Sequence, residues 1–202
     1  MLLFRQPTAH QIRNFLNDQS VLHFSYAEVG ATEKKRISGY NNDRYRTQLG
    51  AGQECWERAC KALRDWKMFS LEWVQLCWPF ARLRPYEMVA VLASHYGFRS
   101  LNAARIVYVI DEPRRFGFAY GTMPDHLEQG EERFQVEWLE DDTVWYEIFS
   151  FSRPRHWLAW LAYPLSRAAQ KRFADDSMEA MEAAVIPGLE ELRSGPLSRE
   201  MY

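Results

Sequence analysis

Residues 68–152 form one long region in which apolar and polar residues alternate, with many Val, Ile, Tyr, Phe and Trp side chains. Alternation with a period of two is typical of strands, so the region predicts six of them, at 69–76, 88–95, 104–111, 115–122, 132–139 and 143–151. The connections carry turn residues such as Gly97, Pro113 and Asp142 and show no helical pattern. We therefore expect successive antiparallel hairpins in one sheet.

Helical periodicity flanks this region on both sides. Segment 7–19 predicts a short helix with Thr8 as its N-cap, and segment 51–66 predicts an amphipathic helix. Segment 154–185 predicts a long helix that begins at Pro154 and is kinked at Pro164, where a backbone hydrogen bond is lost. The polar, glycine-punctuated stretch 24–47 predicts loops.

Short helices, then antiparallel strands, then one long helix are typical of an α+β layer. The long helix is the only predicted element large enough to cover the sheet, and the apolar face of its second half includes Met178 and Met181. The sequence predicts a helix-grip fold, in which a curved antiparallel sheet of about six or seven strands surrounds a long C-terminal helix. We expect a single domain over 1–187 and a loosely ordered tail at 188–202.

Charge and cysteine content exclude several classes of partner. The chain has 202 residues with 25 basic and 27 acidic side chains, a net charge of −2, so no field attracts a polyanion and no nucleic-acid partner is expected. The apolar runs are too short for a transmembrane segment. Three cysteines and no leader pattern predict a cytoplasmic location. Cys55 and Cys60 lie on one predicted helical stripe and are expected to be buried as small hydrophobes.

Two strings carry a family resemblance: RIVYVIDEPRRFGFAYGTMPDHLEQGEERFQVEW at 105–138 and VWYEIFSFSRP at 144–154. The chain resembles the domain-of-unknown-function 1990 family there, and also in FSYAEVGAT at 24–32 and YRTQLGAG at 45–52. The resemblance implies kinship with the helix-grip superfamily of START, polyketide-cyclase and birch-pollen-allergen-like proteins, which hold lipids, steroids, polyketides and other apolar molecules. It implies no activity.

Polar residues are densest at one predicted hairpin connection. The cluster consists of Tyr120, Gly121, Thr122, His126, Glu128, Glu131 and Glu132. A binding site opening there and a merely solvated loop are both compatible with this pattern. His126 and Glu128 lack a third ligand at metal-site spacing, so we expect no metal, and Gly50 and Gly52 lack the other signals of a phosphate loop, so we expect no nucleotide and no cofactor.

Two further charged pairs have open interpretations. Glu137 and Glu147 fall on adjacent predicted strands, where they either point into the covered face of the sheet, with Arg133 or Arg105 as partner, or point outward in cross-strand charge pairs. Arg153 and Arg155 fall at the predicted start of the long helix. They either contact an anionic group or lie there by chance.

The preferred hypothesis is binding of an apolar or amphipathic small molecule between the sheet and the C-terminal helix, without covalent chemistry. The expected ligand-binding residues are Tyr108, Phe118, Tyr120, His126, Tyr146, Glu147 and Met178. One alternative is a cyclase-type or isomerase-type enzyme in the same cavity, in which the proton-transfer group is one of His126, Glu131, Glu137 and Glu147. Another is a protein-interaction or membrane-surface module that uses Trp157 and Trp160.

Overall fold

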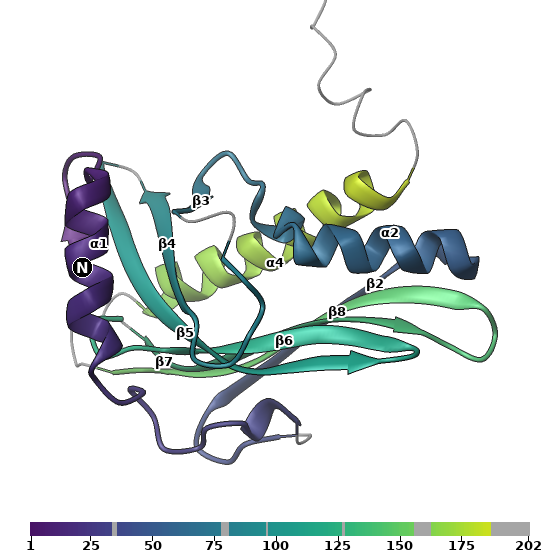
Figure 1. Ribbon diagram of the computed structural model, residues 1–202. Coiled ribbons are helices and arrows are strands. Elements are labelled where there is room, and N and C mark those ends of the chain that lie inside the picture. The colour runs from purple at the N-terminus through teal and green to yellow at the C-terminus, as the bar shows by residue number, and fades with distance from the viewer. Residues whose placement is uncertain (34–35, 78–80, 96, 127, 156–162, 187–202) are drawn as a thin grey trace, which may run out of the picture.

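The computed structural model describes residues 1–33, 36–77, 81–95, 97–126, 128–155 and 163–186. A strongly curved antiparallel sheet forms one layer, and two helices, labelled α2 and α4 in Figure 1, lie together on its concave side. The last described helix is also the longest. The predicted α+β helix-grip fold is thereby confirmed.

Eight strands make up the sheet in the described part of the chain. They are β1 (Leu2–Leu3), β2 (Asn41–Ala51), β3 (Val74–Leu76), β4 (Met88–His95), β5 (Phe98–Glu112), β6 (Arg115–Thr122), β7 (Glu128–Trp138) and β8 (Thr143–Pro154). Their order is β2-β8-β7-β6-β5-β4-β3, with β1 paired to β5 outside this path. All neighbours are antiparallel, and the predicted strands at 88–95 and 115–122 have the bounds that the sequence indicates.

Three α-helices and two 3₁₀ turns complete the described structure: α1 (Ala9–Ser20), α2 (Gly52–Arg64), α4 (Tyr163–Val185), η1 (Ala31–Glu33) and η2 (Lys67–Phe69). Thr8 caps α1 as predicted, since its side chain accepts a hydrogen bond from the Gln11 amide while the Gln11 side chain accepts one from the Thr8 amide. In α2 the predicted apolar stripe is buried, including Cys55 and Cys60.

Two strand predictions need correction. Stretch 24–47, predicted as loops, contains most of β2, an eleven-residue strand at the end of the sheet order. Some residues of β2 that face the inside of the fold are polar, so the strand lacks the alternation of apolar and polar residues by which strands are predicted. It forms because its backbone pairs with β8 over almost its whole length. The predicted strand 69–76 is reduced to Val74–Leu76, because Phe69 ends a 3₁₀ turn and packs inside the fold.

The helix predicted at 154–185 starts later. Pro154 is the last residue of β8, opposite Glu128, a position where the missing amide of proline costs little. Helix α4 is described from Tyr163, so Pro164 is the second residue of its described part. The predicted kink at Pro164 depends on residues 156–162, which lie outside the described residues, and stays a prediction. Arg153 consequently lies in β8, where its guanidinium stacks over Tyr40.

Large side chains between the concave face and the two helices form the main core. Phe118, Phe134, Tyr146, Leu63 and Met181 are all nearly or fully buried there, and each contributes about 2 kcal/mol of hydrophobic free energy. The Tyr146 hydroxyl and the Ser177 hydroxyl, 3.0 Å apart, join β8 to α4. The apolar face predicted for the second half of α4 packs on the sheet as expected.

The convex face is covered in two places. Helix α1 packs against β4 and β5, and the segment that includes η1 lies beneath β7 and β8 in Figure 1. Glu131 fixes this segment by accepting hydrogen bonds from the Tyr26 hydroxyl and the Gly30 amide, both at 2.7 Å, and from Thr32. Gly121 lies in the middle of β6 under the Tyr26 ring, where any Cβ atom would collide with the phenol. This glycine serves a close approach rather than a turn.

Candidate functional site: a cavity between the sheet and α4

A cavity of about 370 Å³ lies between the concave face of the sheet and the first half of α4. Its apolar walls include the rings of Tyr45, Phe69, Trp73 and Phe173. Its polar residues are Asp43, His95, Ser100, Asn102, Tyr120, Thr122, His126, Glu128, Glu131, Glu132, Ser150, Ser152, Ser166 and Gln170. The size and the mixture of apolar walls with a few convergent polar groups are typical of small-molecule sites.

The cavity lies where the concave face changes from apolar to polar. One row across the sheet, from β6 to β2, consists of the apolar or aromatic residues Phe118, Phe134, Ile148 and Tyr45. The next row, two residues along each strand, consists of Tyr120, Glu132, Ser150 and Asp43. Because alternate residues of a strand share a face, this polar row faces the same side as the core, and it lines the cavity instead of filling it.

Glu132 and Tyr120 form the central pair of this polar row. The Tyr120 hydroxyl donates a hydrogen bond to Oε2 of Glu132 at 2.8 Å. The pKa of Glu132 is raised to about 7: burial away from water is the main cause, the hydrogen bond from Tyr120 opposes it, and the nearby carboxylates of Glu128 and Asp43 add to it. Burial also raises the pKa of Tyr120 well above its usual value, so the phenol stays protonated. Glu132 is therefore poised to gain or lose a proton near neutral pH.

A second polar group joins the sheet to the start of α4. Glu128 accepts hydrogen bonds from Ser166 and Gln170 of the helix, and burial raises the pKa of its carboxyl group. Arg167 forms a bidentate ion pair with Asp43 of β2, with nitrogen to oxygen distances of 2.5 and 2.6 Å. These contacts fix the helix over one end of the cavity.

Two histidines line the cavity as neutral rings. Nδ1 of His126 accepts a hydrogen bond from the Glu128 amide at 3.1 Å, so Nε2 carries the proton of the neutral ring. Burial is the main reason that the pKa of His126 is lowered to about 4. Burial also lowers the pKa of His95, whose Nε2 lies 2.9 Å from the Ser100 hydroxyl. Both can exchange hydrogen bonds with a ligand without carrying charge.

The predicted ligand-binding residues divide into three groups. Tyr120 and His126 line the cavity. Phe118, Tyr146 and Met178 belong to the core between the sheet and the helices, where Phe118 packs edge-on against Trp66 at 4.7 Å between ring centroids. These three side chains pack in the core and do not line the cavity.

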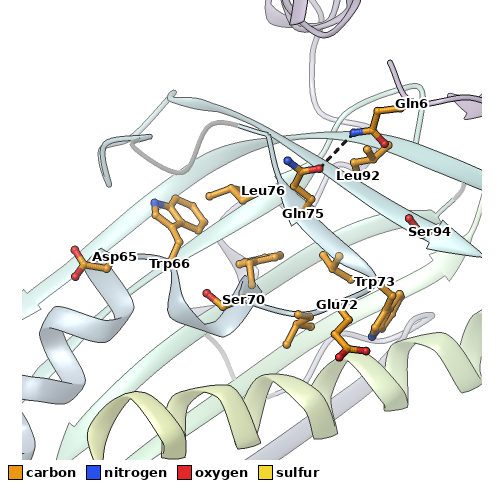
Figure 2. A pocket seen from close by; sticks show the side chains of 13 residues that line it. Gln6, Asp65, Trp66, Ser70, Glu72, Trp73, Gln75, Leu76, Leu92 and Ser94 are labelled. Carbon is orange, nitrogen blue, oxygen red and sulfur yellow. Dashed lines mark hydrogen bonds between the residues drawn. The ribbon is translucent and has the colours of Figure 1, made fainter. Parts of the chain in front are cut away.

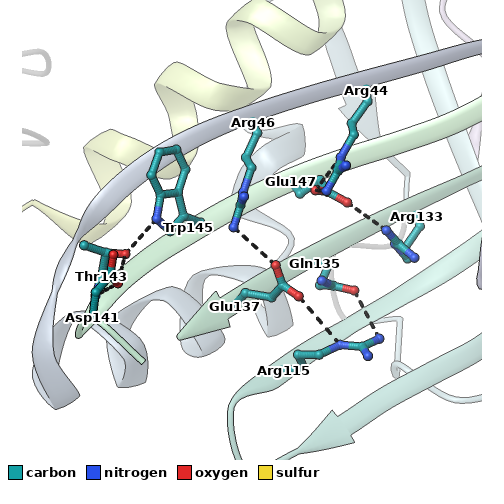
Figure 3. Close-up of polar contacts among 10 residues, drawn as sticks. All are labelled: Arg44, Arg46, Arg115, Arg133, Gln135, Glu137, Asp141, Thr143, Trp145 and Glu147. Carbon is teal, nitrogen blue, oxygen red and sulfur yellow. Dashed lines mark hydrogen bonds and ion pairs between the residues drawn. The ribbon is translucent and has the colours of Figure 1, made fainter. Parts of the chain in front are cut away.

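Tyr108 and Glu147 lie on the convex face, so the prediction that they orient a ligand in the cavity is wrong. The Tyr108 hydroxyl lies 2.7 Å from that of Thr32. Glu147 points away from α4 and accepts hydrogen bonds from Arg44 and Arg133 at 2.5 and 2.7 Å (Figure 3). The physical reason is strand parity, because Glu147 alternates with Tyr146 and Ile148, which fill the concave side.

The carboxylate pair Glu137 and Glu147 follows the outward interpretation. Glu137 pairs with Arg46 at 3.3 Å and with Arg115 at 3.9 Å, as Figure 3 shows, while Glu147 pairs with Arg44 and Arg133. These are cross-strand ion pairs on the convex face. They supply no proton-transfer group to the cavity.

The predicted polar cluster at 120–132 is divided by the sheet. Tyr120, Thr122, His126, Glu128 and Glu132 line the cavity, so a site does open at this connection. The Glu131 side chain instead holds the segment on the convex face.

Glu132 is the important residue that the sequence hypotheses did not select as a proton-transfer group. A signal for it existed, because it shares its parity with Phe134, Val136 and Trp138. A glutamate that continues an apolar strand face marks either a structural ion pair or a functional carboxyl group. The aromatic wall residues Phe69 and Trp73 gave no such signal, since they come from a segment outside the main sheet.

A second pocket, of about 530 Å³, lies on the other side of segment 70–73 (Figure 2). Its lining is more polar and includes Asp65, Ser70, Glu72 and Gln75, and a hydrogen bond of 3.4 Å between the Gln6 and Gln75 side chains crosses one edge. The two pockets share Phe69, Trp73 and Val74 as a common wall. The cavity under α4 is the better candidate site, because it brings titratable groups and aromatic rings together.

Some predictions fall outside the described residues. Trp157 and Trp160, proposed for an interaction or membrane surface, and the predicted tail at 188–202 are among them. Among the described residues, no cluster of three or more His, Cys, Asp or Glu is arranged to hold a metal ion. Within the same residues, no helix has the length and apolar character needed to cross a bilayer.

Comparison with known families identifies close relatives. The family described as domain of unknown function (DUF1990) matches residues 25–180. A UPF0548 protein from Dictyostelium discoideum is 36% identical over 207 residues, covering 92% of this chain and 96% of the relative. A UPF0548 protein from Deinococcus radiodurans is 37% identical over 188 residues, covering 86% and 93%.

Solved structures with the same fold are distant in sequence. An aromatase/cyclase named Zhui, from a Streptomyces species, superimposes with a TM-score of 0.52 at 12% identity, covering 72% of this chain and 93% of that one. A hypothetical protein from Helicobacter pylori gives a TM-score of 0.53 at 9% identity, covering 82% and 98%. At these identities the likeness establishes the fold alone.

Proposed function

The chain belongs to the DUF1990 family, and from that premise we propose that it binds an apolar or amphipathic small molecule in the cavity between the sheet and α4. The observation that carries the proposal is the cavity itself, which has aromatic walls and a hydrogen-bonded Tyr120–Glu132 pair. Aromatic walls favour a ligand with an apolar body, and the polar row provides partners for one polar end. The three cysteines are free thiols, which suits the cytoplasmic location that we expect.

Filling the cavity is the most direct test of this proposal. Ala169 lines the cavity from α4, whereas its neighbour Ala168 is exposed. In Ala169→Trp the indole occupies the ligand space, so binding of the neutral fluorescent probe Nile red should weaken at least tenfold. Ala168→Trp adds the same side chain outside the cavity and serves as the matched control.

Native mass spectrometry of gently purified protein gives an independent measurement. We expect a co-purifying small molecule with the wild-type chain and with Ala168→Trp, and a reduced amount with Ala169→Trp. Ligand-free spectra together with equal Nile red binding by both tryptophan variants would reject the proposal.

The second candidate function is a cyclase-type or isomerase-type enzyme in the same cavity, and Glu132 is the observation that favours it. A carboxyl group with a pKa of about 7, hydrogen-bonded to a phenol, suits general acid–base catalysis at neutral pH. In this second proposal Glu132 takes the role that the sequence hypothesis gave to His126 or to one of Glu131, Glu137 and Glu147, because the carboxylates of those three glutamates bond partners on the convex face. Incubating the co-purified molecule with fresh protein separates the functions: an enzyme converts it and Glu132→Gln does not, whereas a carrier leaves it unchanged.

A further inference from the structure

The charges around the cavity limit the chemical class of ligand that is expected to bind there. We propose that the cavity selects an apolar ligand with a protonated nitrogen, an amine or related organic cation, whose charged end binds the free carboxylate oxygen of Glu132. This inference rests on the proposed function, because it assigns the polar end of a ligand held in the same cavity.

The first argument is the sign of the charges that face the cavity. Four lining residues are acidic, Asp43, Glu128, Glu131 and Glu132, of which Glu131 turns its carboxylate to the convex face, and none of the described lining residues is Lys or Arg. Two cations of α4 lie close to lining residues: Arg167 is engaged in its bidentate pair with Asp43, and Arg172 stacks over the Trp73 ring with its guanidinium carbon 4.6 Å from the ring centroid. The remaining titratable groups that face the space are His95, His126, Tyr45 and Tyr120, whose neutral forms the burial favours. The cavity is therefore electronegative.

The second argument is the hydrogen bonding of Glu132. Its Oε2 accepts the bond from Tyr120, and its Oε1 has no hydrogen-bond partner among the described residues. The side chain is half-buried and lines the cavity. Its free oxygen can therefore be reached from the cavity, where a ligand N–H group would supply the missing donor.

The third argument is the set of aromatic rings that line the same cavity. Phe69 lies 5.3 Å from Phe173 and 6.3 Å from Tyr120 between ring centroids, and Trp73 adds a further wall. Aromatic faces attract organic cations, and they do so more strongly where water is excluded. Rings together with a carboxylate provide both parts of a typical ammonium site.

These features disfavour ligands with an acidic end. A carboxylate or phosphate group would face Glu128 and Glu132, whereas Asp43 is already paired with Arg167, and none of the described lining residues is a cation that could balance the added charge. A neutral alcohol meets no such barrier but gains no charge attraction. The order of affinity expected for matched ligands is amine, then alcohol, then acid.

Three fluorescent probes with one apolar body test this order: naphthylmethylamine, naphthylmethanol and naphthylacetic acid. Isothermal titration calorimetry with the full chain at pH 7.5 should show the amine binding at least tenfold more tightly than the alcohol and the acid binding most weakly. At pH 6.5 the amine should also release protons, because the ammonium group favours the ionised form of Glu132. The comparison among probes uses the wild-type chain and does not depend on any variant folding.

Glu132→Gln identifies the carboxylate responsible. This change keeps the shape of the side chain and a hydrogen-bond acceptor for Tyr120 but removes the charge, so amine affinity should fall at least tenfold while alcohol affinity changes less than threefold. Glu137→Gln removes the charge of a convex-face glutamate and should leave amine affinity unchanged.

Each outcome discriminates between the two proposals. Equal or tighter binding of the alcohol or the acid overturns the amine inference and leaves small-molecule binding intact. Amine binding that survives Glu132→Gln also overturns it. If no probe binds the wild-type chain, the inference fails, and failure of the Nile red and mass spectrometry experiments as well would remove the proposed function.

Discussion

Glu132 and Glu147 occupy neighbouring strands and face opposite sides of one sheet, and the two carboxylates differ in the positive charge that surrounds them. On the convex side, Glu147 is nearly buried but paired with two arginines, of which Arg133 is 13% exposed and Arg44 63% exposed. On the concave side, Glu132 faces a cavity in which none of the described lining residues is Lys or Arg, and it has a pKa of about 7. The protein supplies the countercharge of Glu147, which supports the structure, whereas the described residues around Glu132 supply none.

Breaking the convex pair should have the largest effect on stability. Glu147→Gln leaves the largely buried Arg133 without its countercharge, so the free energy of unfolding should fall by about 3 kcal/mol in urea denaturation at pH 7. Glu137→Gln, at a more exposed pair, provides the control and should cost less than 1 kcal/mol. A loss below 1 kcal/mol for Glu147→Gln would show that the pair has no structural role.

Removing the concave charge should stabilise the protein, in a pH-dependent way. Between about pH 4.5 and 7 the folded chain keeps the Glu132 proton while the unfolded chain releases it, so stability falls as pH rises through this window. Glutamine does not titrate, so Glu132→Gln should exceed the wild type by about 3 kcal/mol at pH 8 and by little at pH 4.5. Urea denaturation at the two pH values measures this, and a gain independent of pH would contradict it.

His126 should show the reverse dependence on pH. Its lowered pKa means that only the unfolded chain takes up a proton as pH falls from 6.5 to about 4, so stability is lost on acidification. Glutamine cannot take up this proton. The free energy of unfolding of His126→Gln, measured relative to the wild type, should therefore be about 2 kcal/mol higher at pH 5 than at pH 8. The imidazole signals in NMR should report the neutral Nε2–H form at pH 5.5. A protonated ring at that pH would refute the prediction.

The smallest effect is expected at Arg44. Its side chain is mostly exposed, and Glu147 keeps Arg133 as a second partner, so Arg44→Ala should cost less than 1 kcal/mol in the same denaturation experiment. A larger loss would mean that the exposed arginine, rather than the buried one, balances Glu147.

Local sequence patterns predicted most elements of this fold. The strands at 88–95 and 115–122 and the capped helix after Thr8 were predicted because period and capping chemistry are local properties. Strand β2 was not predicted, because its inward positions Asn41 and Asp43 are polar and the strand depends on pairing with β8. The start of α4 was misplaced because Pro154 is compatible with a helix start and equally with a strand end.

The candidate site was predicted less completely, for a related reason. Tyr120 and His126 were correctly placed at the cavity, while Tyr108 and Glu147 were assigned to the wrong face. Alternation states which residues share a face of a strand, but not which face the helix covers.

Local patterns along the chain specify the types of most elements, their antiparallel connection, the terminal helix and the sets of side chains that share a strand face. The folded arrangement alone sets Glu132 toward the helix and Glu131 and Glu147 away from it, with no Lys or Arg among the described residues that line the cavity beside Glu132. The reason is that periodicity is a property of neighbours along the chain. Burial, countercharge and the pKa of a carboxyl group depend on residues that are distant in sequence and meet only across the folded sheet.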